Sequence, residues 1–184
     1  NAGGGVGVFI ATRDDEKYAH EYPTLQVSLT GTSEPGEMAF GLTLFEQSSY
    51  GSREHGKDWT GNSVYLWTVA NATYMSLLGP NGFAEIGKTI LQRSHYAAKK
   101  ISELPGISVT WPSGFFKEFV VNFDGTKKKV SETSKSLLSK KIFGGKDLSS
   151  DFPHLGQSAL YCVTEIHTLE DLDSLVSALK EVTK

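Results

Sequence analysis

An apolar pattern with helical spacing runs from Val64 to Leu104, and Gly79-Pro80 interrupts it. Apolar side chains recur every three or four residues on both sides of this dipeptide, which predicts two helices. Glycine accepts the backbone conformation that closes a helix, and proline cannot continue one. The sequence therefore predicts one helix that stops at Gly79-Pro80 and a second, longer helix that ends at Pro105-Gly106.

Strand patterns follow these helices. Residues 107–111 and 115–123 alternate apolar and polar side chains around a turn at residues 112–114, which predicts an antiparallel pair of strands. A modest amphipathic helix is expected over residues 130–142, and another strand over 159–164. Thr168 and Asp171 have the spacing of a capping box at the start of a last helix. The order predicts an α+β fold in which helices cover one face of a small sheet.

The part of the chain before these elements has much weaker patterns of secondary structure. Residues 6–12 read as a strand, and the chain begins without Met in a glycine run, so we interpret it as a fragment whose first element follows a missing segment. Residues 13–58 are rich in turn residues and only weakly periodic. Such a stretch is not expected to form a compact core alone.

Composition excludes several classes of protein. With 18 Lys and Arg against 21 Asp and Glu, the formal charge is -3, which does not favour a nucleic-acid binder. A chain of 184 residues buries roughly 70% of its unfolded surface, so it needs no disulfide, and its one cysteine favours a reducing compartment. No apolar stretch approaches the roughly 20 residues of a membrane span. We expect a soluble, cytoplasmic protein.

Three sequence features could suggest a functional site, but for each of them a structural explanation is favoured. Residues 82–89 satisfy the nucleotide-binding pattern G-x-x-x-x-G-K-[ST], but they fall in the second predicted helix, whose backbone N–H groups are already used. The five histidines and Cys162 show no metal-ligand spacing, so no metal site is expected. Cys162 is predicted to be a small buried side chain on a strand, because no neighbouring residue signals an activated thiol.

Two polar loops are stronger candidates. Residues 46–63 combine cations, hydroxyl groups, side-chain amides and three glycines directly before a predicted helix, which is typical of an anion-facing loop at a helix N-terminus. Residues 143–148 form a second, glycine-bearing loop. For both loops a solvated linker is an equal alternative.

These loops belong to a set of stretches that resemble one family. The stretches are residues 50–63, 76–82, 92–98, 116–123, and 142–148 continuing through 151–153 to 161–165. Together they resemble the C-terminal part of subunit 1 of glycine dehydrogenase (decarboxylating), the P protein of the glycine cleavage system. The glycine run at residues 3–9 resembles the family's entry into a late strand of its large domain.

The resemblance implies a fold and a division of the chain. The fold would be the C-terminal small domain of the aspartate-aminotransferase-like, fold type I class of pyridoxal-phosphate enzymes, with a small antiparallel sheet and helices on one face. Residues 1–58 would be a remnant of the large domain with the polar loop. Residues 59–184 would be the connecting helix and the small domain.

The resemblance also implies a function. With subunit 2, the family decarboxylates glycine on pyridoxal phosphate and passes the aminomethyl group to the lipoyl arm of the H protein. The Schiff-base lysine belongs to the other subunit, in a His-Lys motif that this chain lacks, so the chain alone is expected to be inactive and to hold no cofactor. Candidate site-facing residues are Arg53, Lys57, Thr60 and Asn62 as anion or carboxylate contacts. At the corresponding place many family members have the run Arg-Arg-Glu-Lys-Ala-Thr-Ser-Asn, of which only Arg53 and Glu54 are matched in this chain.

Two other interpretations stay open at this point. The chain could be a non-catalytic binding or scaffold domain. It could also be the small domain of another fold type I enzyme, of the aminotransferase or cysteine desulfurase-like kind. A catalytic lysine upstream of Asn1 would favour the second interpretation.

Overall fold

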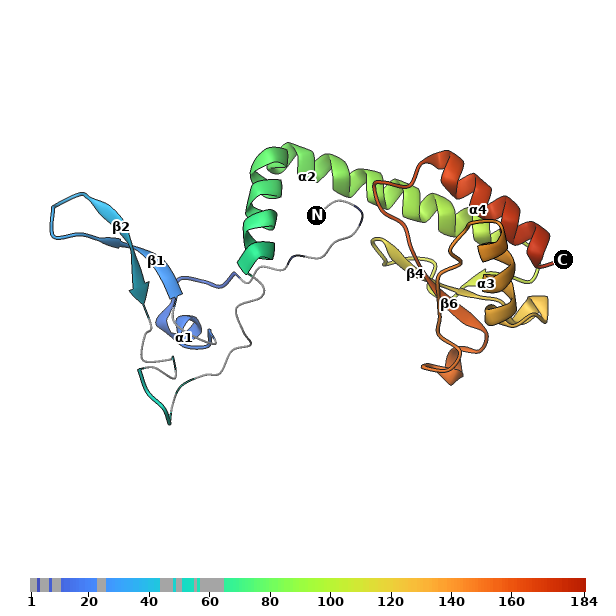
Figure 1. Ribbon diagram of the computed structural model, residues 1–184, viewed down its shortest axis with the longest axis horizontal. Helices are drawn as coiled ribbons and strands as arrows, with labels where there is room; N and C mark the ends of the chain where they lie inside the picture. The colour runs from blue at the N-terminus through green and yellow to red at the C-terminus, as the bar shows by residue number, and fades with distance from the viewer. Residues whose placement is uncertain are drawn as a thin grey trace. The chain divides into compact units, whose positions relative to one another are not determined.

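The computed structural model describes residues 3, 7, 11–22, 26–43, 48, 51–54, 56 and 65–184 (Figure 1). They fall into two compact units. The C-terminal unit comprises residues 1–6 and 72–184, and the N-terminal unit comprises residues 7–71. The division between the units falls inside a helix, between Asn71 and Ala72. The predicted domain boundary between residues 58 and 59 stays a prediction.

The long helix α2 (Tyr65–Ser102) contains the predicted interruption. Gly79 has φ 61° and ψ -177°, which is not helical, and α2 bends there (Figure 1). A positive φ favours glycine at this position, and Pro80 then occupies the first turn of the next helical stretch, where its missing N–H costs little. The predicted position of the break is confirmed. Residues 82–89 lie within α2, so the helical reading of the nucleotide-binding pattern is confirmed as well.

The sheet of the C-terminal unit has four antiparallel strands in the order β3-β4-β6-β5. They are β3 (Ser108–Val109), β4 (Glu118–Asn122), β5 (Lys146–Asp147) and β6 (Ser158–Cys162). The predicted antiparallel pair is confirmed as β3 and β4, both shorter than expected. The loop predicted over residues 143–148 contains a strand, β5, because its backbone pairs with β6.

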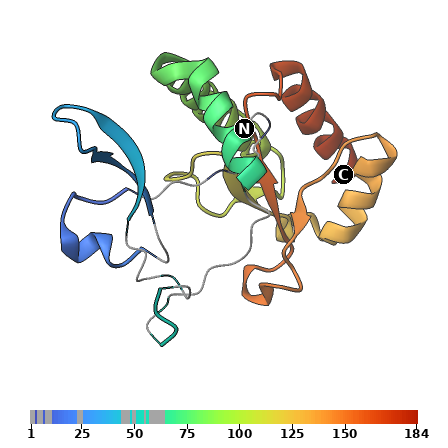
Figure 2. The same cartoon turned by 60° about the vertical axis from the view of Figure 1, so that its left-hand side comes forward.

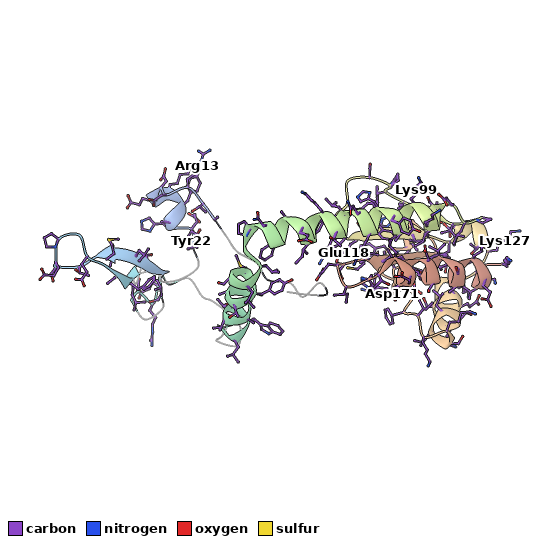
Figure 3. The ribbon with its side chains drawn as sticks, turned by 90° about the horizontal axis from the view of Figure 1, so that it is seen from above. Arg13, Tyr22, Lys99, Glu118, Lys127 and Asp171 are labelled. Atoms are coloured by element: carbon purple, nitrogen blue, oxygen red, sulfur yellow. The ribbon has the colours of Figure 1, made fainter. Side chains whose placement is uncertain are left out.

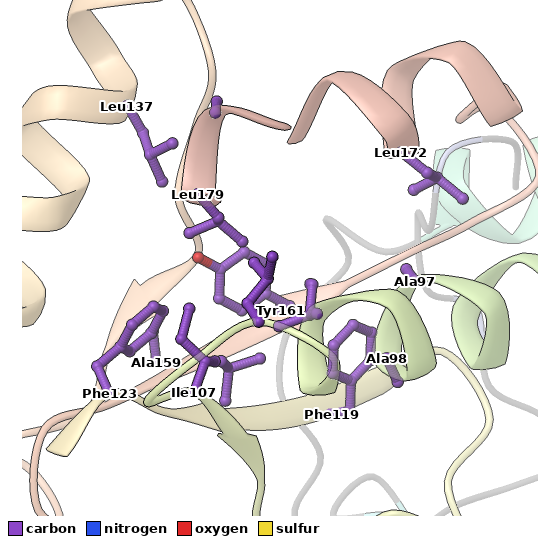
Figure 4. Close-up of a cluster of buried hydrophobic side chains, with 14 of the residues drawn as sticks. Ala97, Ala98, Ile107, Phe119, Phe123, Leu137, Ala159, Tyr161, Leu172 and Leu179 are labelled. Carbon is purple, nitrogen blue, oxygen red and sulfur yellow. The ribbon is translucent and has the colours of Figure 1, made fainter. Parts of the chain in front are cut away.

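One face of this sheet carries the core. Alternate residues along β4, β6 and their C-terminal extensions are buried together: Phe119, Val121, Phe123, Ala159, Tyr161 and Val163. Side chains of α2 and the two later helices pack against them (Figure 4). This period of two places the core residues on one face of the sheet, and Val120 and Ser158 on the other face are buried as well. The predicted α+β fold, with helices covering one face of a small sheet, is confirmed.

Helices α3 (Val130–Ser139) and α4 (Leu169–Val182) lie together beside the sheet (Figures 1 and 2). The capping box of α4 is present, since the Thr168 side chain accepts from Asp171 N and the Asp171 carboxylate accepts from Thr168 N. The two short 3-10 helices are η4 (Asp124–Thr126) and η5 (Pro153–Leu155).

The prediction for Cys162 is wrong, because this side chain is exposed. Tyr161 and Val163 point into the core, so Cys162 between them points to the other face of the sheet, at the end of β6. Partial desolvation raises the pKa of the Cys162 thiol, which keeps it in its less nucleophilic form.

The N-terminal unit contains a short helix, α1 (Glu16–Ala19), and an antiparallel hairpin of β1 (Gln26–Gly31) and β2 (Met38–Thr43). Sequence reasoning missed the hairpin, because its alternating pattern is short and is divided by the Pro35-Gly36 turn. Of the predicted strand over residues 6–12, the structure describes Gly7, Ala11 and Thr12, and these three are not in a strand. No helix in the described part of the chain is long and apolar enough to span a membrane.

Candidate functional site

The first candidate site, the loop at residues 46–63, is described at Ser48, at 51–54 and at residue 56. Ser48 is buried and organises a tight turn: its hydroxyl accepts from Gly51 N at 3.3 Å, and its carbonyl accepts from Gly51 N and Ser52 N, each at 3.0 Å. Arg53 directly follows this turn and is exposed. The turn therefore presents the Arg53 guanidinium at the surface of the N-terminal unit.

The other predicted site residues, Lys57, Thr60 and Asn62, lie outside the described residues. The structure therefore places Arg53 alone among the four, and the assembly of these side chains into one site stays a prediction. The helix α2 begins at Tyr65, two residues after the end of this loop.

The second loop, at residues 143–148, is tightly built. Gly145 has φ 81°, and a Cβ there would lie 2.6 Å from the Leu160 carbonyl oxygen and 3.2 Å from the Tyr161 ring. Beside it, between β6 and the start of α4, is a groove of about 700 Å³. The groove is mainly apolar, and Lys146 at its border pairs with Asp151 at 3.0 Å. This loop therefore has a packing role in addition to any contact with a ligand.

Residues 92–98 join α2 to two distant parts of the C-terminal unit. The Arg93 guanidinium donates to the Glu165 carbonyl, and the Ser94 hydroxyl donates to the Phe116 carbonyl at 2.6 Å. The His95 ring stacks on Phe115 with centroids 4.2 Å apart. These residues fix α2 against the chain before β4 and after β6. Sequence reasoning noted the stretch but not this role.

Tyr96 connects α2 to α4, since its hydroxyl donates to the Asp173 carboxylate at 2.6 Å. This hydrogen bond raises the pKa of Tyr96. A second hydrogen-bonded cluster lies at the end of β4, where the Asp124 carboxylate accepts from Asn122 Nδ2 and from Gln157 N, both at 2.9 Å. The Asn122 hydrogen bond, followed by that of Gln157, lowers the pKa of Asp124. Both clusters stabilise the unit.

The lysines of the described chain are all exposed or half-buried. Lys99 and Lys127, for example, project from the C-terminal unit (Figure 3). A lysine that forms a Schiff base is usually desolvated or next to another cation, which favours its neutral form. Nor do three His, Cys, Asp or Glu side chains come together as possible metal ligands anywhere in the described residues.

Comparison with known proteins places the chain in one family, although no family model matches it. Probable glycine dehydrogenase (decarboxylating) subunit 1 of Desulfitobacterium hafniense is 36% identical over 182 residues, which are 99% of this chain and 40% of the relative. The proteins of the same name in Staphylothermus marinus and Sulfurisphaera tokodaii are also 36% identical, over 96% and 99% of this chain. The chain thus spans about 40% of the length of these curated relatives.

A solved structure agrees with these relatives. The glycine decarboxylase (P-protein) of the glycine cleavage system, crystallised in inhibitor-bound form, superposes with a TM-score of 0.78 and 28% identity. The match covers 91% of this chain and 37% of that one. It confirms the predicted fold, that of the aspartate-aminotransferase-like, fold type I enzymes. By sequence and by structure, the chain belongs to the family of glycine dehydrogenase (decarboxylating) subunit 1.

Proposed function

We propose that this chain is a part of a glycine dehydrogenase (decarboxylating) subunit 1 and acts in the decarboxylation of glycine. The observation that carries the proposal is the 36% identity to such subunits over 99% of the chain. The partners would be subunit 2 and the lipoylated H protein, which receives the aminomethyl group, and the location would be cytoplasmic. The common name of relatives from three genera favours this activity over an aminotransferase, a cysteine desulfurase or a scaffold.

Pyridoxal phosphate would be held by the partner subunit. The described lysines do not fit a covalent attachment site, because none of them is buried. When bound, the cofactor supplies an electron sink for the electron pair released as CO₂ leaves glycine. This chain would contribute polar groups around a site whose covalent anchor lies elsewhere.

Arg53, Lys57, Thr60 and Asn62 would be those groups. Arg53 is presented by the Ser48 turn, and the loop leads into the N-terminus of α2, where the helix dipole favours an anion. A guanidinium can bind a carboxylate or phosphate through two parallel hydrogen bonds. These residues would orient a carboxylate or phosphate and leave proton transfer to other groups.

The test uses a full-length subunit 1 that contains this sequence, assembled with subunit 2 and H protein. Carbon exchange between glycine and bicarbonate is measured. Charge-assisted hydrogen bonds contribute about 1.5 to 3 kcal/mol each, so Arg53→Ala and Lys57→Ala should each lower exchange at least about tenfold. Arg13→Ala, which also removes an exposed arginine of the N-terminal unit, is the matched control and should change little.

Two results would count against the proposal. If the assembled wild-type subunits catalyse no exchange, the proposed activity is wrong. If exchange is normal and both variants retain it, the activity stands, but the loop is a solvated linker and its residues have no role in the site.

A further inference from the structure

The turn between β6 and α4, residues 163–168, connects several segments of the C-terminal unit. Inside this turn the Glu165 carbonyl accepts a hydrogen bond from the Arg93 guanidinium of α2. The Glu165 carboxylate accepts another from Gly3 N at 2.8 Å. The turn therefore holds the end of β6, the start of α4, the helix α2 and the backbone at residue 3 together.

His167 closes this turn through a hydrogen bond whose direction is fixed. Thr164 N donates to His167 Nδ1 at 3.0 Å, and Thr164 is only 2% exposed. A backbone N–H group can only donate, so His167 Nδ1 must be an unprotonated acceptor. The imidazole of His167 is therefore neutral in this arrangement, with its proton on Nε2.

Protonation of the ring is incompatible with this hydrogen bond. In an imidazolium both nitrogens are donors, so Nδ1 no longer accepts from Thr164 N. The acceptors nearest to a protonated Nδ1 are the Thr164 hydroxyl at 3.3 Å and the Thr164 carbonyl at 3.4 Å. A protonated ring would thus turn to these oxygens and leave the buried Thr164 N–H without its acceptor. The two forms of the ring favour different arrangements of the turn.

The surroundings of His167 act on the ring in opposite directions. Asp171, in the first turn of α4, is a carboxylate close enough to interact electrostatically with it: the hydrogen bonds from Thr168 lower the pKa of Asp171 most, and attraction to His167 lowers it further. This carboxylate favours the imidazolium, whereas the Thr164 N–H favours the neutral ring. The other titratable groups in the turn or along the groove that His167 lines are Lys141, Lys146, Tyr161, Cys162 and Glu165.

We propose that His167 is a pH-sensitive switch in the turn between β6 and α4. With a neutral ring the Thr164–His167 hydrogen bond keeps the turn closed, and protonation opens it. Glu165 lies between the two partners of this bond, so its contacts with Arg93 and Gly3 loosen when the turn opens. Histidine is the side chain that ordinarily changes charge between about pH 5 and 8, so the switch would act in that range.

The experiment is a titration of the ¹⁵N-labelled chain from pH 8 to pH 5, followed by nuclear magnetic resonance. At pH 8 the ring nitrogens of His167 should show the proton on Nε2. As the pH falls, the Thr164 amide signal should change with the same midpoint as the His167 ring. Exchange of the Thr164 amide, corrected for its intrinsic pH dependence, should become about three- to tenfold faster, as expected for the loss of one hydrogen bond. A proton on Nδ1 at pH 8, or a Thr164 amide that does not follow the ring, would overturn the proposal.

Two variants and a control separate the role of the ring from that of other titrating groups. His167→Asn keeps an acceptor oxygen on the γ-carbon but does not titrate, so protection of the Thr164 amide should stay constant from pH 8 to pH 5. His167→Ala removes the acceptor, and protection should be low throughout. His154→Asn, at an exposed histidine of η5, should keep the wild-type pH response. A pH response that persists in His167→Asn would show that another group titrates and that the proposal is wrong. The wild-type titration decides the question even if a variant does not fold.

Discussion

Replacing Leu179 by alanine tests whether the C-terminal unit has the core described above. Leu179 is fully buried on α4, in the cluster that contains Leu137 and Tyr161 (Figure 4). Truncating a buried leucine removes its transfer free energy and leaves a cavity, which together cost about 2.7 to 5 kcal/mol. Leu169 starts the same helix and is 52% exposed, so Leu169→Ala should cost less than about 0.5 kcal/mol.

The assay is urea denaturation followed by far-ultraviolet circular dichroism. With a slope of about 2 kcal/mol/M, Leu179→Ala should lower the unfolding midpoint of this unit by about 1.3 to 2.5 M, and Leu169→Ala by less than about 0.3 M. If the two variants shift the midpoint equally, α4 does not present the face assigned to it. If neither variant shifts it, the cluster is not the core of the unit.

Three further predictions follow from local geometry. Gly106→Ala should destabilise the unit by more than about 1 kcal/mol in the same assay, because Gly106 has φ 77° and a Cβ would lie 2.7 Å from the Gly125 carbonyl; an unchanged midpoint would contradict this close approach. The Thr168 backbone and side-chain hydrogen bonds lower the pKa of Asp171 in the folded state, so the stability they give is present above about pH 4 and is lost as pH falls through that lowered pKa. Midpoints measured from pH 7 to pH 2 should show this loss, and Asp171→Asn should reduce it. Calorimetry with Mg-ATP should show no binding at residues 82–89, since these are helical; saturable binding removed by Lys88→Ala would show that the helical reading is wrong.

The helices could be predicted because their periodicity is local. Both parts of α2, the break at Gly79 and the capping box of α4 depend on residues within a few positions of one another. The strands, in contrast, are defined by backbone hydrogen bonds to residues that are far away in the sequence. β5 is two residues long and is defined by its pairing with β6, more than ten residues later, so its sequence alone indicated a loop. The residues before Glu118 were predicted as strand, but β3 is too short to pair with them.

The candidate site, too, could be predicted from the sequence only in part. The composition of residues 46–63 indicated a polar loop before a helix, but resemblance to a family was needed to give it a role. The structure describes Arg53 of the four candidate residues. The contacts of Arg93 and Ser94 were invisible to sequence reasoning, since their acceptors lie 72 and 22 residues away.

The proposed division of labour between the two subunits is tested by locating the covalently bound cofactor. A full-length subunit 1 containing this sequence is assembled with subunit 2 and pyridoxal phosphate, reduced with borohydride, and digested for mass spectrometry. We expect a pyridoxyl group on one lysine of subunit 2 and none on any lysine of this chain. A stoichiometric pyridoxyl group on a lysine of this chain would contradict it.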